Sequence, residues 1–347
     1  MHFPIAGVTV NPYYLIGLGV LVGVSGGFMG MGGGWLLVPA LSALGTPMNI
    51  AVGTSLAQML GAAIVSAMRH WQFGNISFRI ATIMIPGSLL GVEFGAFIIE
   101  LLKGQGPTQV DFGIGVTFAG ILTLVSLFVL RDALKDYTRA RQLAASHPGD
   151  SIHKYHVTPV RPIPRRLQAI KLKPCIACPI SGIESISVWA ILAVAFIMGT
   201  LTGLLGIGGG LVGLPLLVYV IGVPTRVAVG TVVLTVVVAS GFGTFSHALK
   251  GNGDLLMALF IFIGAAIGSQ IGALATRYVS GIFIRALFAV AALGAAASVV
   301  LNTFLGLRTA ALVVVLMVGV LTCALIIQLL FTGLLRSRRQ RLDSNSP

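Results

Sequence analysis

Residues 26–40 read GGFMGMGGGWLLVPA, and residues 202–216 read TGLLGIGGGLVGLPL. In both stretches a cluster of glycines lies inside an otherwise apolar segment. Glycine is disfavoured inside helices and strands because it loses the most conformational freedom on folding. Each cluster therefore predicts a break in a hydrophobic element. The question is whether these breaks pack helices or bind a ligand.

The composition places these breaks in a membrane protein. Of the 347 residues, 56% are hydrophobic and 9% are charged, and the mean hydropathy is +1.00. A helix needs about 20 apolar residues to cross a bilayer, and uncharged runs of this length recur, for example at 112–130, 227–249 and 309–335. A membrane β-barrel would instead alternate polar and apolar residues in short segments. The sequence therefore predicts an all-α polytopic membrane protein.

The chain contains an internal duplication. The GxGGG motif at 30–34 recurs at 206–210, and the proline that follows it, Pro39, recurs as Pro215. After one inserted residue, Ala-Val-Gly-Thr at 51–54 recurs at 228–231. The same register matches His70 with His247, Gly74-Asn75 with Gly251-Asn252, and Gly87, Gly91 and Gly95 with Gly264, Gly268 and Gly272. So many identities in one register indicate two copies of one structural unit.

The duplication divides the chain into five expected parts. These are a first transmembrane repeat at 12–131, a basic cytoplasmic loop at 132–185, a second transmembrane repeat at 186–305, an additional helix at 306–335 and a basic cytoplasmic tail at 336–347.

The positive charge predicts the orientation of the repeats. If the loop and the tail face the cytoplasm, every Lys and Arg except Lys103, Lys250 and Arg308 falls on that side, as the positive-inside rule requires. The His70 turn is then cytoplasmic and the His247 turn lies outside, so the repeats are expected to be inverted. Inverted repeats are typical of secondary transporters. We expect anionic lipid headgroups at the loop and the tail, and no nucleic-acid partner, because no binding motif accompanies the charge.

The glycine motifs predict a site for an anion. The segments 12–27 and 35–44 are each short for a membrane crossing, so we expect broken or re-entrant helix pairs joined by unwound glycine backbone. Such backbone is tolerated at membrane depth only where protein or a water-filled cavity satisfies it. The helices that begin after Gly34 and Gly210 would aim their N–H groups and positive dipole ends at this place. Two such loops that converge from opposite sides would form a pocket suited to an anion.

The glycines at four-residue spacing have a different interpretation. Gly87, Gly91 and Gly95, with their partners in the second repeat, keep the spacing of a helix-packing face. Small residues at this spacing let two membrane helices approach closely. We therefore expect these glycines to pack helices rather than to bind a ligand.

The chain resembles the TauE/SafE family of sulfite exporters. The resemblance rests on the paired Gly-x-Gly-Gly-Gly-x(4)-Pro motifs, each followed by Ala-Val-Gly-Thr and then by a His-x(3)-Gly-Asn turn, and it covers about 26–98 and 203–276. It implies a multi-pass permease of the bacterial inner membrane for sulfur-containing anions such as sulfite, sulfonates or related organosulfur acids. The resemblance does not identify the substrate.

The substrate-site hypothesis combines the glycine loops with polar side chains on the helices that follow them. Hydroxyl and amide groups are neutral donors to an oxyanion, although Ser and Thr in membrane helices often bond only to their own backbone. The proposed residues are Gly30, Gly32, Gly33, Gly34, Thr54, Ser55, Gln58, Gly206, Gly208, Gly209, Gly210 and Thr231.

Four further residues are candidates for coupling or gating. Glu93 interrupts an apolar segment, and its partner in the second repeat is Gln270. A carboxylate inside a membrane helix is by default a functional hypothesis, either as a proton carrier or as the partner of a cation. His70 and His247 occupy matched positions near the ends of their segments, where a histidine is either a cap or a proton-linked gate.

The basic loop contains a possible metal motif. His153 and His156 precede Cys175 and Cys178 at a spacing that can supply four zinc ligands. The order is the reverse of the common zinc finger, and the alternatives are a reactive dithiol and ordinary reduced cysteines. We expect no resident cofactor.

The sequence therefore predicts a secondary transporter rather than an enzyme. Its expected substrate is a small sulfur-containing anion, held between the paired GxGGG loops near the membrane midplane and exported. The chain has no nucleotide-binding motif that would power a pump. The alternative is a membrane scaffold or integral-membrane protein whose cytoplasmic loop is metal- or redox-active. The sequence does not determine the oligomeric state.

Overall fold

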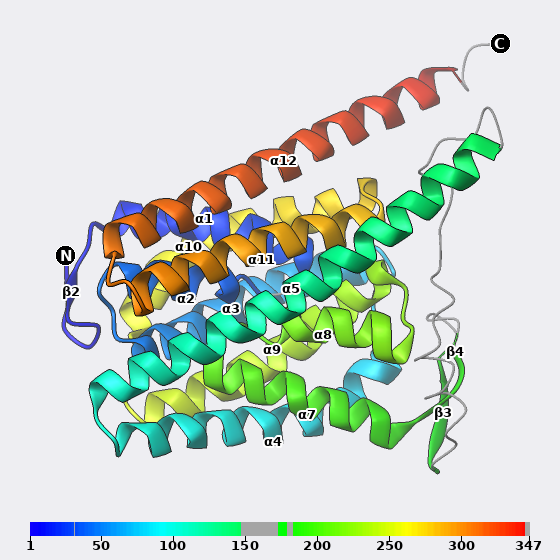
Figure 1. The fold of residues 1–347 in the computed structure, drawn as a ribbon. Coiled ribbons are helices and arrows are strands. Elements are labelled where there is room, and N and C mark those ends of the chain that lie inside the picture. Colours follow the sequence, from blue (N-terminus) through cyan, green and yellow to red (C-terminus); the bar gives the residue numbers. More distant parts are fainter. Residues whose placement is uncertain (31, 147–172, 179–182, 344–347) are drawn as a thin grey trace.

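The computed structural model describes residues 1–30, 32–146, 173–178 and 183–343, which form a bundle of long helices (Figure 1). A hairpin of β1 (His2–Phe3) and β2 (Val8–Thr9) precedes the first half, and a hairpin of β3 (Cys175–Cys178) and β4 (Ile183–Ser187) precedes the second. The first half contains α1 (Pro12–Met29), α2 (Gly34–Ala43), α3 (Met48–Gln72), α4 (Phe78–Lys103) and α5 (Pro107–Ser146). The second half contains α7 (Val188–Leu205), α8 (Gly210–Leu216), the π-helical segment η3 (Leu217–Ile221), α9 (Thr225–Leu249), α10 (Leu255–Ala275), the 3-10 turn η4 (Thr276–Tyr278) and α11 (Gly281–Thr303). The last helix is α12 (Arg308–Asp343).

The described helices confirm the all-α polytopic class. Within the described ranges, 9 helices are long and apolar enough to cross a membrane, and many large hydrophobic side chains are exposed on their outer faces. With 18 residues α1 is one of these helices. The expectation that both segments flanking the first glycine loop are short therefore holds only for α2. In the second half the short apolar helix covers Gly210–Ile221.

Each glycine loop reverses the direction of the chain. Gly30 ends α1 with φ of 74° and Gly33 precedes α2 with φ of 89°, a left-handed region that favours glycine. A Cβ on Gly33 would overlap Val22 of α1, so α2 folds back against the helix that precedes it. In the second half Gly209, with φ of 67°, lies in the same way against Met198 of α7. The predicted glycine-broken segments are therefore two helix hairpins, α1–α2 and α7–α8.

The two halves exchange equivalent contacts. The helix α1 packs along α10, and α7 packs along α4, so the first helix of each half lies against the fourth helix of the other. Glycines on α4 and α10 make these approaches possible, because a Cβ there would meet the backbone of the partner helix. The contacts are Gly87 with Leu192, Gly91 with Phe196, Gly95 with Thr200, Gly264 with Ile16, Gly268 with Val20 and Gly272 with Val24. The prediction that these glycines pack helices is confirmed.

The central helices α3 and α9 run antiparallel. Gly53, near the start of α3, lies against the carbonyl of Asn252 after α9, and Gly230, near the start of α9, lies against the carbonyl of Asn75 after α3. In each half, the glycine of the Ala-Val-Gly-Thr motif therefore contacts the asparagine of the Gly-Asn turn in the other half.

The His70 and His247 turns lie at opposite ends of the bundle. Just after the first turn, Arg79 of α4 donates to the carbonyl of Ala177 in β3 (3.1 Å). Beside the second, the amide of Ala6, between β1 and β2, donates to Asp254 (3.3 Å). Figure 1 places β3–β4 and the N-terminal hairpin at opposite ends.

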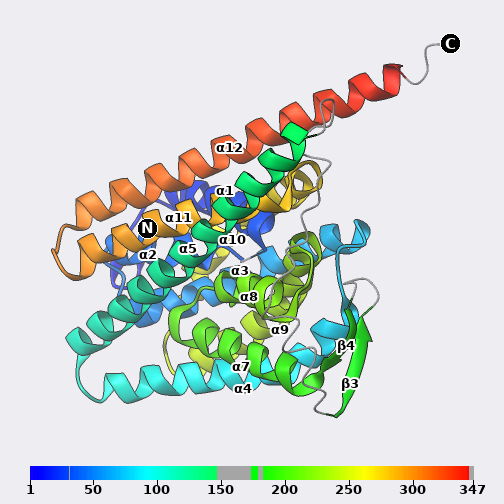
Figure 2. The ribbon, with the colours of Figure 1, turned by 45° about the vertical axis from the view of Figure 1, so that its right-hand side comes forward.

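Two helices extend beyond the membrane segments expected from the sequence. The helix α5 continues past residue 131 to Ser146, and α12 continues past residue 335 to Asp343. Both project from the β3–β4 end of the bundle (Figure 2). The first part of the predicted loop and most of the predicted tail are therefore helical.

Candidate substrate site

The tips of the two helix hairpins meet. A Cβ on Gly34 would overlap the carbonyl oxygen of Gly206, and the hydroxyl of Ser55 donates to that same oxygen (2.9 Å). Gly206 also lies against Val52 of α3, and Gly30 lies against Val229 of α9. The structure thus brings the loops at 30–34 and 206–210 together, between the central helices of both halves.

Buried polar groups without partners lie on the elements around this meeting point. Gln58 of α3 is fully buried, and neither its amide oxygen nor its amide nitrogen has a hydrogen-bond partner in the described part of the chain. The same holds for the indole N–H of Trp35, which follows Gly34, and for the hydroxyl of Ser66. A buried polar group without a partner costs about 1–3 kcal/mol. We therefore treat these three side chains as candidate ligand contacts.

Ser55, Gln58 and Ser66 lie on one face of α3. Their spacing of three and then eight residues repeats the turns of a helix. The substrate-site hypothesis from the sequence contains Ser55 and Gln58 but neither Ser66 nor Trp35. The available signal was this spacing, because a serine and a tryptophan in an apolar segment are otherwise unremarkable.

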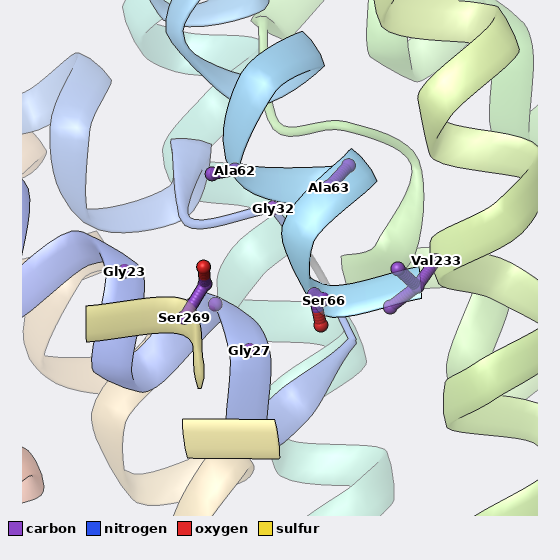
Figure 3. Close-up of a pocket in the computed structure, with 9 residues that line it drawn as sticks. Gly23, Gly27, Gly32, Ala62, Ala63, Ser66, Val233 and Ser269 are labelled. Atoms are coloured by element: carbon purple, nitrogen blue, oxygen red, sulfur yellow. The ribbon is translucent and has the colours of Figure 1, made fainter. Parts of the chain in front are cut away.

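A small cavity lies on the same face of α3 (Figure 3). In this conformation it leaves no room for a water molecule. Small residues of α1, α3 and α10 line it together with the first glycine loop and one side chain of α9. The lining residues are Gly23, Gly26, Gly27, Gly32, Ala62, Ala63, Ser66, Val233 and Ser269.

Thr54 and Thr231 connect the two halves. The hydroxyl of Thr54 accepts a hydrogen bond from the amide of Asp254 (2.9 Å), and that of Thr231 accepts one from the amide of Ser77 (3.0 Å). Each threonine thus binds the residue before the fourth helix of the other half. Their predicted contact with substrate stays a prediction, and the structure gives each hydroxyl a structural role.

His70 and His247 also occupy equivalent places. Both are fully buried. His70 Nε2 lies 3.3 Å from the carbonyl oxygen of Gly27, and His247 Nε2 lies 2.9 Å from that of Gly203. Each histidine therefore ties the third helix of its half to the helix before the glycine loop. Nδ1 of each ring has no partner among the residues described.

Glu93 and Gln270 each accept a hydrogen bond from the facing helix of the other half. Glu93 of α4 pairs with Lys250 (2.6 Å) and accepts from Ser246 (2.6 Å), both from the end of α9. Gln270 of α10 accepts from Arg69 of α3 (3.2 Å). The side chain of Glu93 is 49% exposed, so the structure does not bury this carboxylate in a central cavity. The role of Glu93 as a coupling residue stays a prediction. Its ion pair with Lys250 gives the carboxylate a structural role.

We expect Glu93→Gln to lower the melting temperature of the purified protein, because it leaves Lys250 without its carboxylate. Glu93→Gln combined with Lys250→Gln should recover most of the loss, as double-mutant cycles reveal for coupled charges. An unchanged melting temperature, together with loss of the flux response to a pH gradient, would instead assign Glu93 to proton coupling.

A buried ion-pair cluster lies at the β3–β4 end of the bundle. Arg285 of α11, with its side chain 3% exposed, contacts Asp136 (2.8 Å) and Asp132 (3.4 Å), both on α5. It also donates to the hydroxyl of Tyr219 in η3 (3.4 Å). From the charge distribution alone, Arg285 was expected only to be a cytoplasmic charge. The cluster therefore connects η3 with α5 and α11.

The structure describes only some of the proposed zinc ligands. His153 and His156 lie outside the described residues, and so does the side chain of Cys178. Cys175 is exposed and lies opposite Ser187 in the β3–β4 hairpin. Within the described ranges no group of three or more His, Cys, Asp or Glu could hold a metal ion. Zinc binding by the loop stays a prediction.

Comparison with known proteins agrees with this architecture. The sequence profile described as Sulfite exporter TauE/SafE matches residues 15–299. The chain belongs to this family. The family consists of membrane transporters, so the chain is a multi-pass membrane transporter rather than an enzyme.

Curated relatives of the chain carry consistent names. The probable membrane transporter protein YunE of Bacillus subtilis is 28% identical over 271 residues, which cover 76% of this chain and 88% of the relative. A probable membrane transporter protein of Xylella fastidiosa is 27% identical over 266 residues, which cover 76% and 84%. One from Methanocaldococcus jannaschii is 28% identical over 230 residues, which cover 64% and 68%. No solved structure matches the chain.

Proposed function

We propose that this TauE/SafE member is a secondary transporter that exports a small sulfur-containing anion, such as sulfite, a sulfonate or a related organosulfur acid, across the cytoplasmic membrane. The substrate is held where the tips of the α1–α2 and α7–α8 hairpins meet. The observation that carries this proposal is the contact of Gly34 with Gly206 at Ser55, with the buried amide of Gln58 one turn further along α3 and unpartnered among the described residues.

The chemistry of the site suits an anion. The N-terminal end of α2 aims backbone N–H groups and a positive dipole end at the meeting point, and Gln58, Trp35 and Ser66 carry donors that lack partners among the described residues. Neutral donors bind an anion without leaving a buried charge when the site is empty, which a transporter needs in order to release its cargo.

We also propose that the two halves are inverted repeats in the membrane. The antiparallel α3 and α9, and the placement of the His70 and His247 turns at opposite ends, support this arrangement. The β3–β4 end, from which the ends of α5 and α12 project, is then cytoplasmic. This orientation puts the basic loop and tail beside anionic headgroups.

Single cysteines at Gly74 and Gly251 test the orientation in a background without native cysteines. Both positions have positive φ and open space around a Cβ, so the two substitutions carry equal strain. We expect a membrane-impermeant thiol reagent to label Gly251→Cys from outside intact cells, and Gly74→Cys only in inside-out vesicles. Labelling of both from the same side would contradict the inverted repeat.

Flux in proteoliposomes tests the proposed substrate class. We expect the purified protein to move at least one of sulfite, thiosulfate and sulfoacetate down an imposed gradient, with acetate moving at the rate of empty liposomes. Flux of acetate equal to that of the sulfur anions would contradict the selectivity, and no flux of any sulfur anion would contradict the proposed function.

A further inference from the structure

The two halves differ at three matched positions around the cavity that adjoins the first glycine loop. On the His70 side, the cavity of Figure 3 is lined by Ser66 of α3, Val233 of α9 and Ser269 of α10. The duplication register matches these residues with Gly243, Leu56 and Val92. At these three positions the His70 side therefore carries two hydroxyls and the His247 side carries none. Thr202 and Ser240, which match the lining residues Gly26 and Ala63, each donate to a carbonyl of their own helix.

The apolar junction on the His247 side is filled. A Cβ on Gly243 would lie 3.1 Å from Leu56 and 3.3 Å from Val92. Thr202 stands where the first half has Gly26, and its hydroxyl oxygen would lie 2.6 Å from a Cβ on Gly209. Larger side chains thus occupy the space that small residues surround in the first half.

The hydroxyl junction on the His70 side has an unused donor. Ser66 is 2% exposed, and its hydroxyl lines the cavity without a hydrogen-bond partner in the described ranges. Among the residues that the structure describes, Ser269 donates to the carbonyl of Ala266 in its own helix (3.2 Å), and such a hydroxyl can rotate toward a better acceptor. Gly32 of the first glycine loop completes the wall. An oxyanion has several acceptor oxygens, so it can accept hydrogen bonds from both hydroxyls that line this cavity.

We propose that Ser66 and Ser269 form a subsite for the oxyanion group of the transported anion on the His70 side of the hairpin tips, and that Leu56 and Val92 close the equivalent place on the His247 side. The inference rests on the proposed transport function. The subsite has no room for a water molecule in this conformation, so its walls separate when the anion enters. An alternating-access transporter undergoes this kind of change.

The test measures concentration dependence of flux in proteoliposomes for sulfite, thiosulfate and sulfoacetate, with Ser66→Ala and Ser269→Ala. Loss of a hydrogen bond to a charged group should raise the half-saturating concentration about tenfold or more. Ser240→Ala is the matched control, because Ser240 is a buried hydroxyl of α9 that donates to Val236 of its own helix (2.6 Å) outside the cavity. It should leave that concentration unchanged. Ser66→Leu, which places an apolar plug in the cavity, should abolish flux.

Each outcome decides between the two proposals. A parent protein that moves none of the three anions contradicts the transport function, and the subsite with it. A parent that transports, with unchanged half-saturating concentrations in both alanine variants, contradicts the subsite alone. A fall in maximal rate without a change in half-saturation, or an equal effect of Ser240→Ala, assigns the serines to packing and also overturns the subsite.

Discussion

Replacing Gly34 with alanine is expected to reduce anion flux to the level of empty liposomes. Gly34 begins α2 with ordinary helical backbone, so alanine costs nothing in conformation. The added Cβ would instead overlap the carbonyl oxygen of Gly206, and the two hairpin tips would have to separate. Flux into proteoliposomes of the purified variant is the measurement.

The matched control for this substitution is Gly17→Ala in the same hairpin, because a Cβ there has nothing within 4 Å. We expect it to transport at the parental rate. Gly33→Val and Gly209→Val should also abolish flux, but both combine an overlap with a positive φ that valine rarely adopts. Full flux in Gly34→Ala would show that the contact between the hairpin tips is unnecessary for transport.

Arg285→Met is expected to destabilise the protein by roughly 3–5 kcal/mol, the usual cost of removing one partner from a buried ion pair. Asp136, with its side chain 2% exposed, would lose the guanidinium that it contacts at 2.8 Å. The measurement is the midpoint of denaturation in detergent, at equal protein concentration.

Arg277→Met serves as the control for this effect. Arg277 is exposed and lies over the ring of Phe73, 5.9 Å from its centroid, and an exposed cation–π contact contributes roughly 0.5–1 kcal/mol. The midpoint should therefore move little. Equal midpoints for the two variants would mean that the Arg285 cluster does not stabilise the fold.

The glycine pattern predicted the helix breaks and the close helix packing, because glycine changes what the backbone can do wherever it occurs. Three successive glycines strongly disfavour a continuous helix, so the breaks at 30–34 and 206–210 could be located from the sequence. The four-residue spacing of Gly87, Gly91 and Gly95 likewise indicated packing, and the structure places α7 against them. Helix breaking and close helix packing both depend on one residue type and its spacing, so they can be read from the sequence.

Contacts between side chains distant in the sequence could not be predicted in the same way. Glu93 interrupts an apolar segment, but hydropathy does not tell which face of a helix a residue occupies, and the structure pairs it with Lys250. Asp132 and Asp136 follow the uncharged run at 112–130, so their charges predicted a loop. They lie on a continuing helix and meet Arg285 only through packing of α5 against α11.

The measurement that tests the central claim most directly is the location of a bound sulfonate. Crystals grown with 2-bromoethanesulfonate would place a bromine whose anomalous signal marks the ligand. We expect its sulfonate either beside the meeting point of Gly34 and Gly206, within hydrogen-bond distance of Gln58, or in the adjoining cavity, within hydrogen-bond distance of Ser66. A ligand found only at Arg285 or on the outer face of the bundle, with the hairpin tips unoccupied, would contradict the account.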